Sequence, residues 1–417
     1  MFIHNHYLNY GDIPMKKNYR LRIFFAGVVS LLCCGLFILA GCKEDKGTSV
    51  FDLVTPGKPQ PVIDSLSPAG TALAGAQAIT VYGKNFSSVI GENFIYFNGK
   101  AARILSATTT KLVVNSAVDS GLQAVKLTVA GAEKYSDPVP YRLFFAVEPF
   151  STVTPPSTGV GPITPDSSSN LYFELLATGN ENGIYILSPS GVQSQYTTKT
   201  TQATKWLSLK MGPGGALYAA KGSRAVYKYP KSGADAAFWG VGSPPFSDID
   251  FDQNKNLWAG GNDVSIYCFR PDSSSNVIPF DGAVHALRVY NGYLYFSATK
   301  DSAEKVFRAQ ITGDALGPIA EYFNITTAVG TPYAGRSITF SSDGYMYVGT
   351  EAPLGIIVVA PDGSSSTPYA DYASNFGTIV SSIAWGPGEV LYASTYEGGL
   401  FKIHTKKTAG APYYGVK

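Results

Sequence analysis

Charged residues, cysteines and histidines are scarce in this chain of 417 residues, at 15%, four and four respectively. Lysine plus arginine (32) nearly balances aspartate plus glutamate (30), so no electrostatic feature predicts nucleic acid as a partner. Charge is also too sparse for the flanks of coiled-coil heptads, and glycine without a three-residue period excludes collagen. The 45% of hydrophobic residues allows a large buried core, which excludes disorder as the main state.

The N-terminal segment has the charge and hydropathy pattern of an export signal. Four basic residues between positions 16 and 22 precede an almost unbroken apolar stretch over 23–40, a pattern typical of a secretory signal. The Leu-Ala-Gly-Cys sequence at 39–42 resembles the bacterial lipoprotein signal-peptidase box, in which the cysteine becomes the lipid-modified first residue. We expect residues 1–42 to be such a signal, ending at lipidated Cys42. An uncleaved membrane-spanning helix is the alternative.

The residues after Cys42 predict a location outside the cell. Lys-Glu-Asp-Lys at 43–46 resembles a short acidic export signal, with which some Gram-negative bacteria send lipoproteins to the outer face of the outer membrane. Pro56, Gly57 and Pro59 within 43–60, with Pro61 just after, predict a flexible tether over 43–60. We therefore expect a lipid-anchored protein of the outer membrane that is exposed at the cell surface, with an outer-membrane transporter complex as one candidate partner.

Few residues of this chain could bind a metal ion or act as a nucleophile. Without the signal, the histidines are His285 and His404, and the cysteines are Cys42 and Cys268, which are too few for a His/Cys zinc site. A Gly-x-Ser-x-Gly elbow, a phosphate-binding loop and a His-Glu-x-x-His motif are also missing. We expect no resident metal and no cofactor, apart from the calcium alternative below.

Residues 61–147 predict a small β-sandwich. Short runs rich in β-branched and aromatic residues predict strands, Asn98-Gly99 is typical of a tight hairpin, and several strands at this spacing indicate a sandwich. Three segments resemble the IPT/TIG family of immunoglobulin-like domains: PVIDSLSP at 61–68, ITVYGKNF at 79–86 and YFNG at 96–99. The resemblance implies an immunoglobulin-like fold. Its basic residues are scattered, so we expect no nucleic acid and interpret the domain as a spacer.

Residues 161–417, after a linker at 148–160, predict six repeats. An apolar strand, a polar turn and then Leu or Met with an aromatic residue recur at a mean spacing of 44 residues, with anchors at Tyr172, Tyr218, Trp258, Tyr295, Tyr347 and Tyr392. This period predicts one four-stranded blade per repeat. The repeats resemble NHL-type six-bladed propellers, most clearly over 249–258. The chain is thus predicted to be all-β, an immunoglobulin-like β-sandwich followed by a six-bladed β-propeller.

The sequence leaves open which strand closes the propeller. Tyr413-Tyr414 could finish the sixth blade, or the segment near 143–147 could pair with it across the ring.

One aspartate-rich segment could form a calcium loop. Its acidic and amide residues alternate over 248–256 as in an oxygen-ligand site, but the glycine and terminal glutamate of such a loop are missing. The alternative is the polar turn that every repeat contains. We favour that turn, and calcium is the minor hypothesis.

Aligned repeats bring other polar residues to equivalent positions near the start of each innermost strand. One position holds Leu207, Ser247, His285, Arg336 and Ser381, and the next holds Ser208, Asp248, Ala286, Ser337 and Ser382. Asp248, His285 and Arg336 are the catalytic candidates, because three neighbouring blades could direct them to one ligand. Six-bladed propellers include lactonases that hold a metal in an acidic cage, which this sequence lacks. A lone histidine is more often structural.

Aromatic residues are abundant, and most anchor blades. Five fall outside the anchor positions and are candidate binding residues, since exposed rings suit sugar faces or protein partners: Trp206, Trp239, Phe246, Tyr369 and Tyr372. Packing in the core is the alternative for each.

These patterns favour a surface-tethered, non-enzymatic binding lipoprotein that recognises a polysaccharide or a partner protein through the propeller face. Two alternatives stay open: a hydrolase or lyase acting at the channel mouth, and a scaffold of an outer-membrane complex. Fold alone does not separate them.

Overall fold

A computed structural model describes residues 57–150, 159–177, 180–197, 205–231, 237–242, 245–262, 264–377, 379–397 and 399–416. The predicted signal, Cys42 and most of the predicted tether lie outside these residues. Residues 58–417 form one compact unit. In the part of the chain that is described, no helix has the length and apolar character needed to traverse a bilayer.

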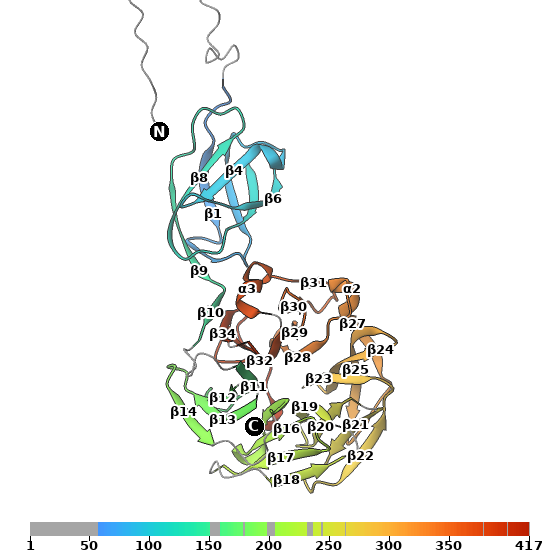
Figure 1. The fold of residues 1–417 in the computed structure, drawn as a ribbon. Helices are drawn as coiled ribbons and strands as arrows, with labels where there is room; N and C mark the ends of the chain where they lie inside the picture. The colour runs from blue at the N-terminus through green and yellow to red at the C-terminus, as the bar shows by residue number, and fades with distance from the viewer. Residues whose placement is uncertain are drawn as a thin grey trace, which may run out of the picture. The chain divides into compact units, whose positions relative to one another are not determined.

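The first domain is a sandwich of two sheets (Figure 1). Strands with alternating burial send one row of side chains inward, where Val81, Leu112, Leu127 and Leu143 form the core. Only β2 and β9 pair in parallel among the neighbouring strands described. One sheet has the order β1 (Val62–Ser67), β3 (Ile79–Lys84), β7 (Lys111–Asn115), β6 (Arg103–Ala107). The other has the order β2 (Thr71–Ala74), β9 (Val139–Phe145), β8 (Gly121–Val129), β4 (Asn93–Phe97), β5 (Lys100–Ala101).

The second domain is a ring of six antiparallel sheets, the blades, whose strands run in order from the innermost to the outermost. The first three blades are β11 (Gly159–Pro165), β12 (Leu171–Ala177), β13 (Asn180–Leu187), β14 (Gln193–Thr197); β15 (Ser208–Met211), β16 (Leu217–Ala220), β17 (Ala225–Tyr229), β18 (Ala237–Val241); and β19 (Phe246–Phe251), β20 (Leu257–Gly261), β21 (Ser265–Phe269), β22 (Ser275–Pro279).

The fourth blade is β23 (Ala283–Tyr290), β24 (Tyr293–Lys300), β25 (Ala303–Thr312), β27 (Ala320–Asn324), with β26 (Ala315–Leu316) folded back on β25. The fifth is β28 (Gly335–Phe340), β29 (Met346–Thr350), β30 (Ile356–Val359), β31 (Ser365–Ser366). The last is β32 (Val380–Trp385), β33 (Val390–Thr395), β34 (Gly399–His404), β10 (Val147–Pro149). Two short helices, α2 (Ile325–Val329) and α3 (Ala373–Phe376), lie between blades in the sequence.

The apolar cores of the propeller lie between neighbouring blades. Tyr218 of the second blade meets Phe251 of the third edge to face, with ring centroids 4.9 Å apart. Tyr295 of the fourth blade packs on Phe340 of the fifth at 4.7 Å. Each blade therefore needs a neighbour on both faces, and only a closed ring supplies them all.

The strand β10 closes this ring. It precedes the first blade in sequence, yet it pairs with β34 as the outermost strand of the last blade, with Val147 opposite Ile403. This is the second of the two closures that the sequence left open. The predicted domain boundary at residue 147 therefore falls at the first residue of a propeller strand, because strand pairing with distant residues decides where this segment belongs.

Replacing Val147 by aspartate tests this closure. Val147 is 2% exposed in the core of the last blade, so a carboxylate there would lack partners and should lower the free energy of unfolding by about 3 kcal/mol or more. Val241 occupies the outermost strand of the second blade and is 65% exposed, so Val241→Asp should cost less than about 0.5 kcal/mol. Urea unfolding measures both, and equal effects would contradict the closure.

Candidate functional site

β-Bulges place one set of polar side chains near the start of the innermost strands. The pairing with the second strand skips Ser247 in β19, His285 in β23, Arg336 in β28 and Ser381 in β32, and it skips 161–162 in β11. A bulge removes a residue from the ladder and re-aims its side chain. These four residues are the ones that the repeat alignment put at one position. Together with the groups they contact, they define the channel mouth.

The next residue along these strands links neighbouring blades instead. The Asp248 carboxylate accepts hydrogen bonds from the Ser208 hydroxyl of the second blade and from the Leu287 amide of the fourth, the latter at 2.8 Å. Ser337 and Ser382 likewise accept from the amides of the following innermost strand, at 3.0 and 3.3 Å. Burial raises the pKa of Asp248, against the opposing effect of these hydrogen bonds.

Asp248 is therefore separate from the two other catalytic candidates. It is 8% exposed and all its described contacts are structural. The prediction that it joins His285 and Arg336 at a ligand does not match its position, because adjacent residues around a bulge point to different sides.

The aspartates of the proposed calcium loop are also directed to different partners. Asp250 forms an ion pair with Arg288 at 2.8 Å, whereas Asp252 accepts from the Asn254 and Asn256 amides and caps the turn. Within the described ranges, no three His, Cys, Asp or Glu side chains converge as metal ligands would. The turn interpretation of this segment thus fits the structure better than calcium.

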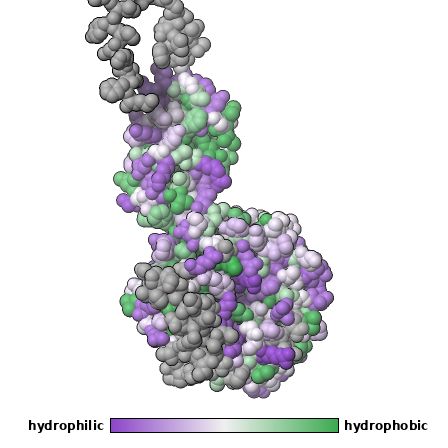
Figure 2. Space-filling model, in the orientation of Figure 1, coloured by the Kyte–Doolittle hydropathy of each residue, from purple (hydrophilic) through white to green (hydrophobic). Residues whose placement is uncertain are grey.

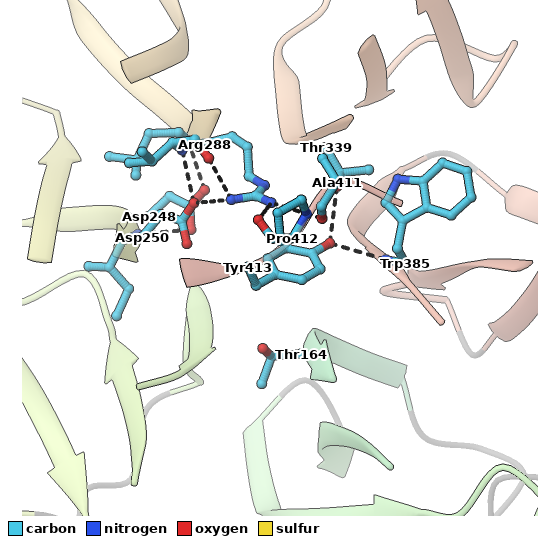
Figure 3. Close-up of polar contacts among 12 residues, drawn as sticks. Thr164, Asp248, Asp250, Arg288, Thr339, Trp385, Ala411, Pro412 and Tyr413 are labelled. Atoms are coloured by element: carbon cyan, nitrogen blue, oxygen red, sulfur yellow. Dashed lines mark hydrogen bonds and ion pairs between the residues drawn. The ribbon is translucent and has the colours of Figure 1, made fainter. Parts of the chain in front are cut away.

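The C-terminal segment crosses the other end of the channel (Figure 3). The Arg288 guanidinium donates to the Pro412 carbonyl at 2.8 Å and lies 4.1 Å from the centre of the Tyr413 ring. The Tyr413 hydroxyl accepts from the Trp385 amide and bonds to the Thr339 hydroxyl, at 3.1 and 3.0 Å. The tail thus touches innermost strands of three blades at this end. Tyr413 plugs the ring rather than finishing a blade.

At the channel mouth, His285 belongs to a hydrogen-bonded chain that ends on a buried carboxylate. His285 Nε2 lies 2.8 Å from the Thr299 hydroxyl, which donates to Glu304 at 2.8 Å. Glu304 is completely buried and also accepts from the Gly335 amide at 3.1 Å. When Glu304 is ionised, Thr299 gives its only proton to the carboxylate and accepts from His285 Nε2–H, which leaves Nδ1 as a proton acceptor.

Burial sets the charge state of this chain near neutral pH. It lowers the pKa of His285 to about 4, and the positive charge of Arg336 adds to the effect. It raises the pKa of Glu304 to about 7, against the hydrogen bonds from Gly335 and Thr299. His285 is therefore neutral at pH 7, and its imidazole can accept a proton or a hydrogen bond.

Arg336 interacts with side chains of its own blade and of both neighbouring blades. Its guanidinium is paired with Glu351, with Nε 2.8 Å from Oε1. Its charge acts on His285 and also on Tyr396, where it opposes the pKa rise caused by burial of the phenol. The Lys205 ammonium lies 4.2 Å from the centre of the Tyr396 ring. Side chains of at least the fourth, fifth and last blades thus act on one another at this end.

Four of the five predicted aromatic binding residues are core residues. Trp206 and Phe246 are fully buried, and Tyr369 and Tyr372 are 3% and 1% exposed. Trp206 meets Tyr227 edge to face at 5.2 Å. Their predicted exposure is wrong, because positions outside the repeat pattern also fill the spaces between blades.

Two of these rings have further contacts that explain their burial. Partly buried Trp239 is edge to face with Tyr218 at 5.2 Å. The Tyr372 hydroxyl donates to the Ala74 carbonyl and accepts from the Ala146 amide, both at 2.8 Å.

Sequence reasoning missed the acidic side chains of the mouth. It compared only the innermost strands, where acids are few, whereas Thr299, Glu304 and Glu351 lie on or after the second and third strands of their blades. Glu304 is the one acid in β25, and an acid within a strand was the available signal.

The fold and this mouth define a protein class: a six-bladed β-propeller that follows an immunoglobulin-like domain. The family model of the IPT/TIG domain matches residues 61–143. A comparison of the sequence with curated proteins finds no match.

Solved structures share the architecture at low sequence identity. A luciferin-regenerating enzyme is 15% identical, with a TM-score of 0.51 over 65% of this chain and 99% of that one. An auxiliary nutrient binding protein from Bacteroides ovatus is 12% identical (TM-score 0.47; 84% and 99% covered). A gluconolactonase from Xanthomonas campestris is 12% identical (TM-score 0.49; 64% and 89% covered). These likenesses extend to the fold alone.

Asp248→Ala tests the structural role of this residue. It leaves the buried Leu287 amide and Ser208 hydroxyl without their acceptor, so the free energy of unfolding should fall by about 2–4 kcal/mol. Asp362 caps an exposed turn through Ser364, and Asp362→Ala should leave the thermal midpoint nearly unchanged. Calorimetry compares the two. If Asp248→Ala is as stable as the wild type but no longer binds the ligand, Asp248 is a binding residue and the structural role is wrong.

Proposed function

We propose that this protein is a cell-surface binding lipoprotein whose propeller binds an oligosaccharide at the channel mouth. The observation that carries the proposal is the set of β-bulges at the start of four innermost strands. They place Ser247, His285 and Arg336 at one end of the channel, whereas the bulged Ser381 is buried and bonds to Ser394. The tail occupies the other end.

The chemistry of the mouth favours a polar ligand with many hydroxyl groups. The Arg336–Glu351 pair offers donors and acceptors side by side, and the neutral His285 adds an acceptor at Nδ1. Sugar hydroxyls use both kinds of group, and such polar groups fix a ligand's orientation in a concave site. Because positive and negative charges are paired at the mouth, a net charge on the ligand adds little electrostatic attraction, and a neutral ligand is favoured.

A hydrolase or lyase is the second candidate, and one observation favours it. The Glu304–Thr299–His285 chain fixes the tautomer of a neutral imidazole at the mouth. A histidine held this way can act as a general base, because its unprotonated Nδ1 is on the opposite side of the ring from Nε2, which Thr299 holds.

Arg336→Met should weaken oligosaccharide binding at least tenfold, because the bulged guanidinium is a donor within the mouth. Arg270, just after β21, forms a comparable ion pair with Asp314 in the turn after β25. Arg270→Met is therefore the matched control and should change the affinity less than twofold. Calorimetric titration with neutral and acidic di- to tetrasaccharides measures both.

The same titrations separate the two candidates. Product that forms with time in the wild-type protein and disappears in His285→Ala would establish an enzyme and overturn the binding proposal. If no saccharide binds and none is converted, the oligosaccharide proposal fails, and a partner protein or a scaffold role in an outer-membrane complex takes its place.

The membrane anchor is part of the same proposal. The basic segment, the apolar stretch and the Leu-Ala-Gly-Cys ending support lipidation of Cys42. In a Gram-negative host fed an alkyne-labelled palmitate, the protein should incorporate label, and Cys42→Ser should abolish it. The buried Cys268 is the control, since Cys268→Ser should keep the label. Equal labelling of the wild-type and Cys42→Ser proteins would contradict the anchor.

A further inference from the structure

Among the residues that the structure describes, the well-exposed aromatic side chains lie on the sandwich. In the described ranges, five aromatic residues are well exposed, and all belong to the first domain: Tyr82, Phe94, Tyr135, Phe144 and Phe145. Apolar residues stand among polar ones on the visible surface of that domain (Figure 2). Isolated exposed rings are common, but rings gathered at a hollow indicate a binding surface.

Two tyrosines form such a hollow on the outer face of the β8–β4 sheet. A groove of about 470 Å³ is lined by Tyr96, Asn98, Gly99, Ala124, Lys126 and Tyr135. The Tyr96 and Tyr135 rings are 6.1 Å apart with their planes at 62°, and Tyr135 is 51% exposed. Strand pairing puts Lys126 directly opposite Tyr96, and the small side chain of Ala124 leaves the space between them.

The backbone holds this groove in shape before any ligand arrives. The Tyr135 carbonyl accepts from the Gln60 side chain at 2.7 Å, and the next residue, Ser136, bonds to Leu127 through both its amide and its hydroxyl. On the other side, the Asn98 side chain bonds to the Leu122 carbonyl and the Ala124 amide. A ring fixed by its backbone loses little conformational entropy on binding.

We propose that this groove is a glycan-binding site distinct from the propeller mouth. A pyranose ring has apolar faces that stack on aromatic rings and a rim of hydroxyls that need polar partners. Tyr96 and Tyr135 supply the rings, and Lys126 supplies a donor. Lys126 has no ion-pair partner within the described residues, so its charge is available to a hydroxyl or a carboxylate of the sugar chain.

The dimensions favour a sugar chain over a protein surface. The volume of about 470 Å³ lies within the range of small-ligand sites, and the two rings form walls of a groove rather than a flat apolar patch. A stable protein interface buries about 800 Å² on each partner, far more than two tyrosines and a lysine provide.

Retardation of the full mature chain in gels that contain a polysaccharide tests the proposal. The probes are polygalacturonate and alginate as acidic glycans, and xylan and galactomannan as neutral ones. Tyr135→Ala should weaken retention by the preferred glycan at least tenfold. Ala124→Leu should do the same by filling the groove while both rings stay. Tyr82, exposed on the opposite sheet, is the matched control, and Tyr82→Ala should leave retention unchanged.

A failure of this site is distinguishable from a failure of the propeller proposal. Retention that survives Arg336→Met and is lost in Tyr135→Ala supports the sandwich site. Retention that needs Arg336 and not Tyr135 overturns it, as does the absence of retention by all four polysaccharides. Analytical ultracentrifugation of the same variants tests whether a second copy of this chain occupies the groove instead. A wild-type dimer that Tyr135→Ala abolishes would also overturn the glycan site.

Discussion

Closure of the ring is the constraint on which the propeller depends. Every blade has two apolar faces, and its core is shared with a neighbour, as in the contact of Tyr218 with Phe251. A single missing contact between two blades would expose both of their faces to water. The chain solves this with β10, which comes from before the first blade and pairs with β34 in the last. This pairing and the hydrogen bonds between the first and last blades, such as that from the Ile163 amide to Ser382, join the two ends of the propeller sequence around the channel.

On the four innermost strands with a one-residue bulge, the bulged position lies at the channel end that we propose binds a ligand, and the next position faces the neighbouring blade. The bulged residues, such as His285 and Arg336, leave the ladder and become available at the mouth. The residues that follow them, such as Asp248 and Ser337, accept hydrogen bonds from the edge amides of the next blade. These amides would otherwise be unpaired donors beside the channel, which is costly. The links between blades and the proposed binding therefore use adjacent residues.

Aromatic residues have opposite roles in the two domains. In the propeller the rings fill wedge-shaped spaces between blades, and even rings outside the repeat pattern, such as Trp206, are buried. The sandwich is too thin to bury both faces of its sheets, so outward-pointing positions of β4 and the loop before β9 remain at the surface. Tyr96 and Tyr135 are consequently available to a ligand. The domain that its sequence suggests is a spacer thus has a groove lined by two tyrosines, which we propose binds a glycan.

The sequence by itself determined the number of blades, the order of the two domains and the shared position near the start of the innermost strands, which is polar in the third to sixth blades. These features follow from local periodicity, because strands alternate every two residues and each blade repeats its turn chemistry. Tertiary structure alone decided three others: that β10 closes the ring, that Asp248 links blades while its neighbour faces the mouth, and which rings are exposed. Each depends on a contact between residues distant in the chain, or on a one-residue bulge that reverses a side chain's direction. A local sequence pattern indicates neither the distant contact nor the bulge.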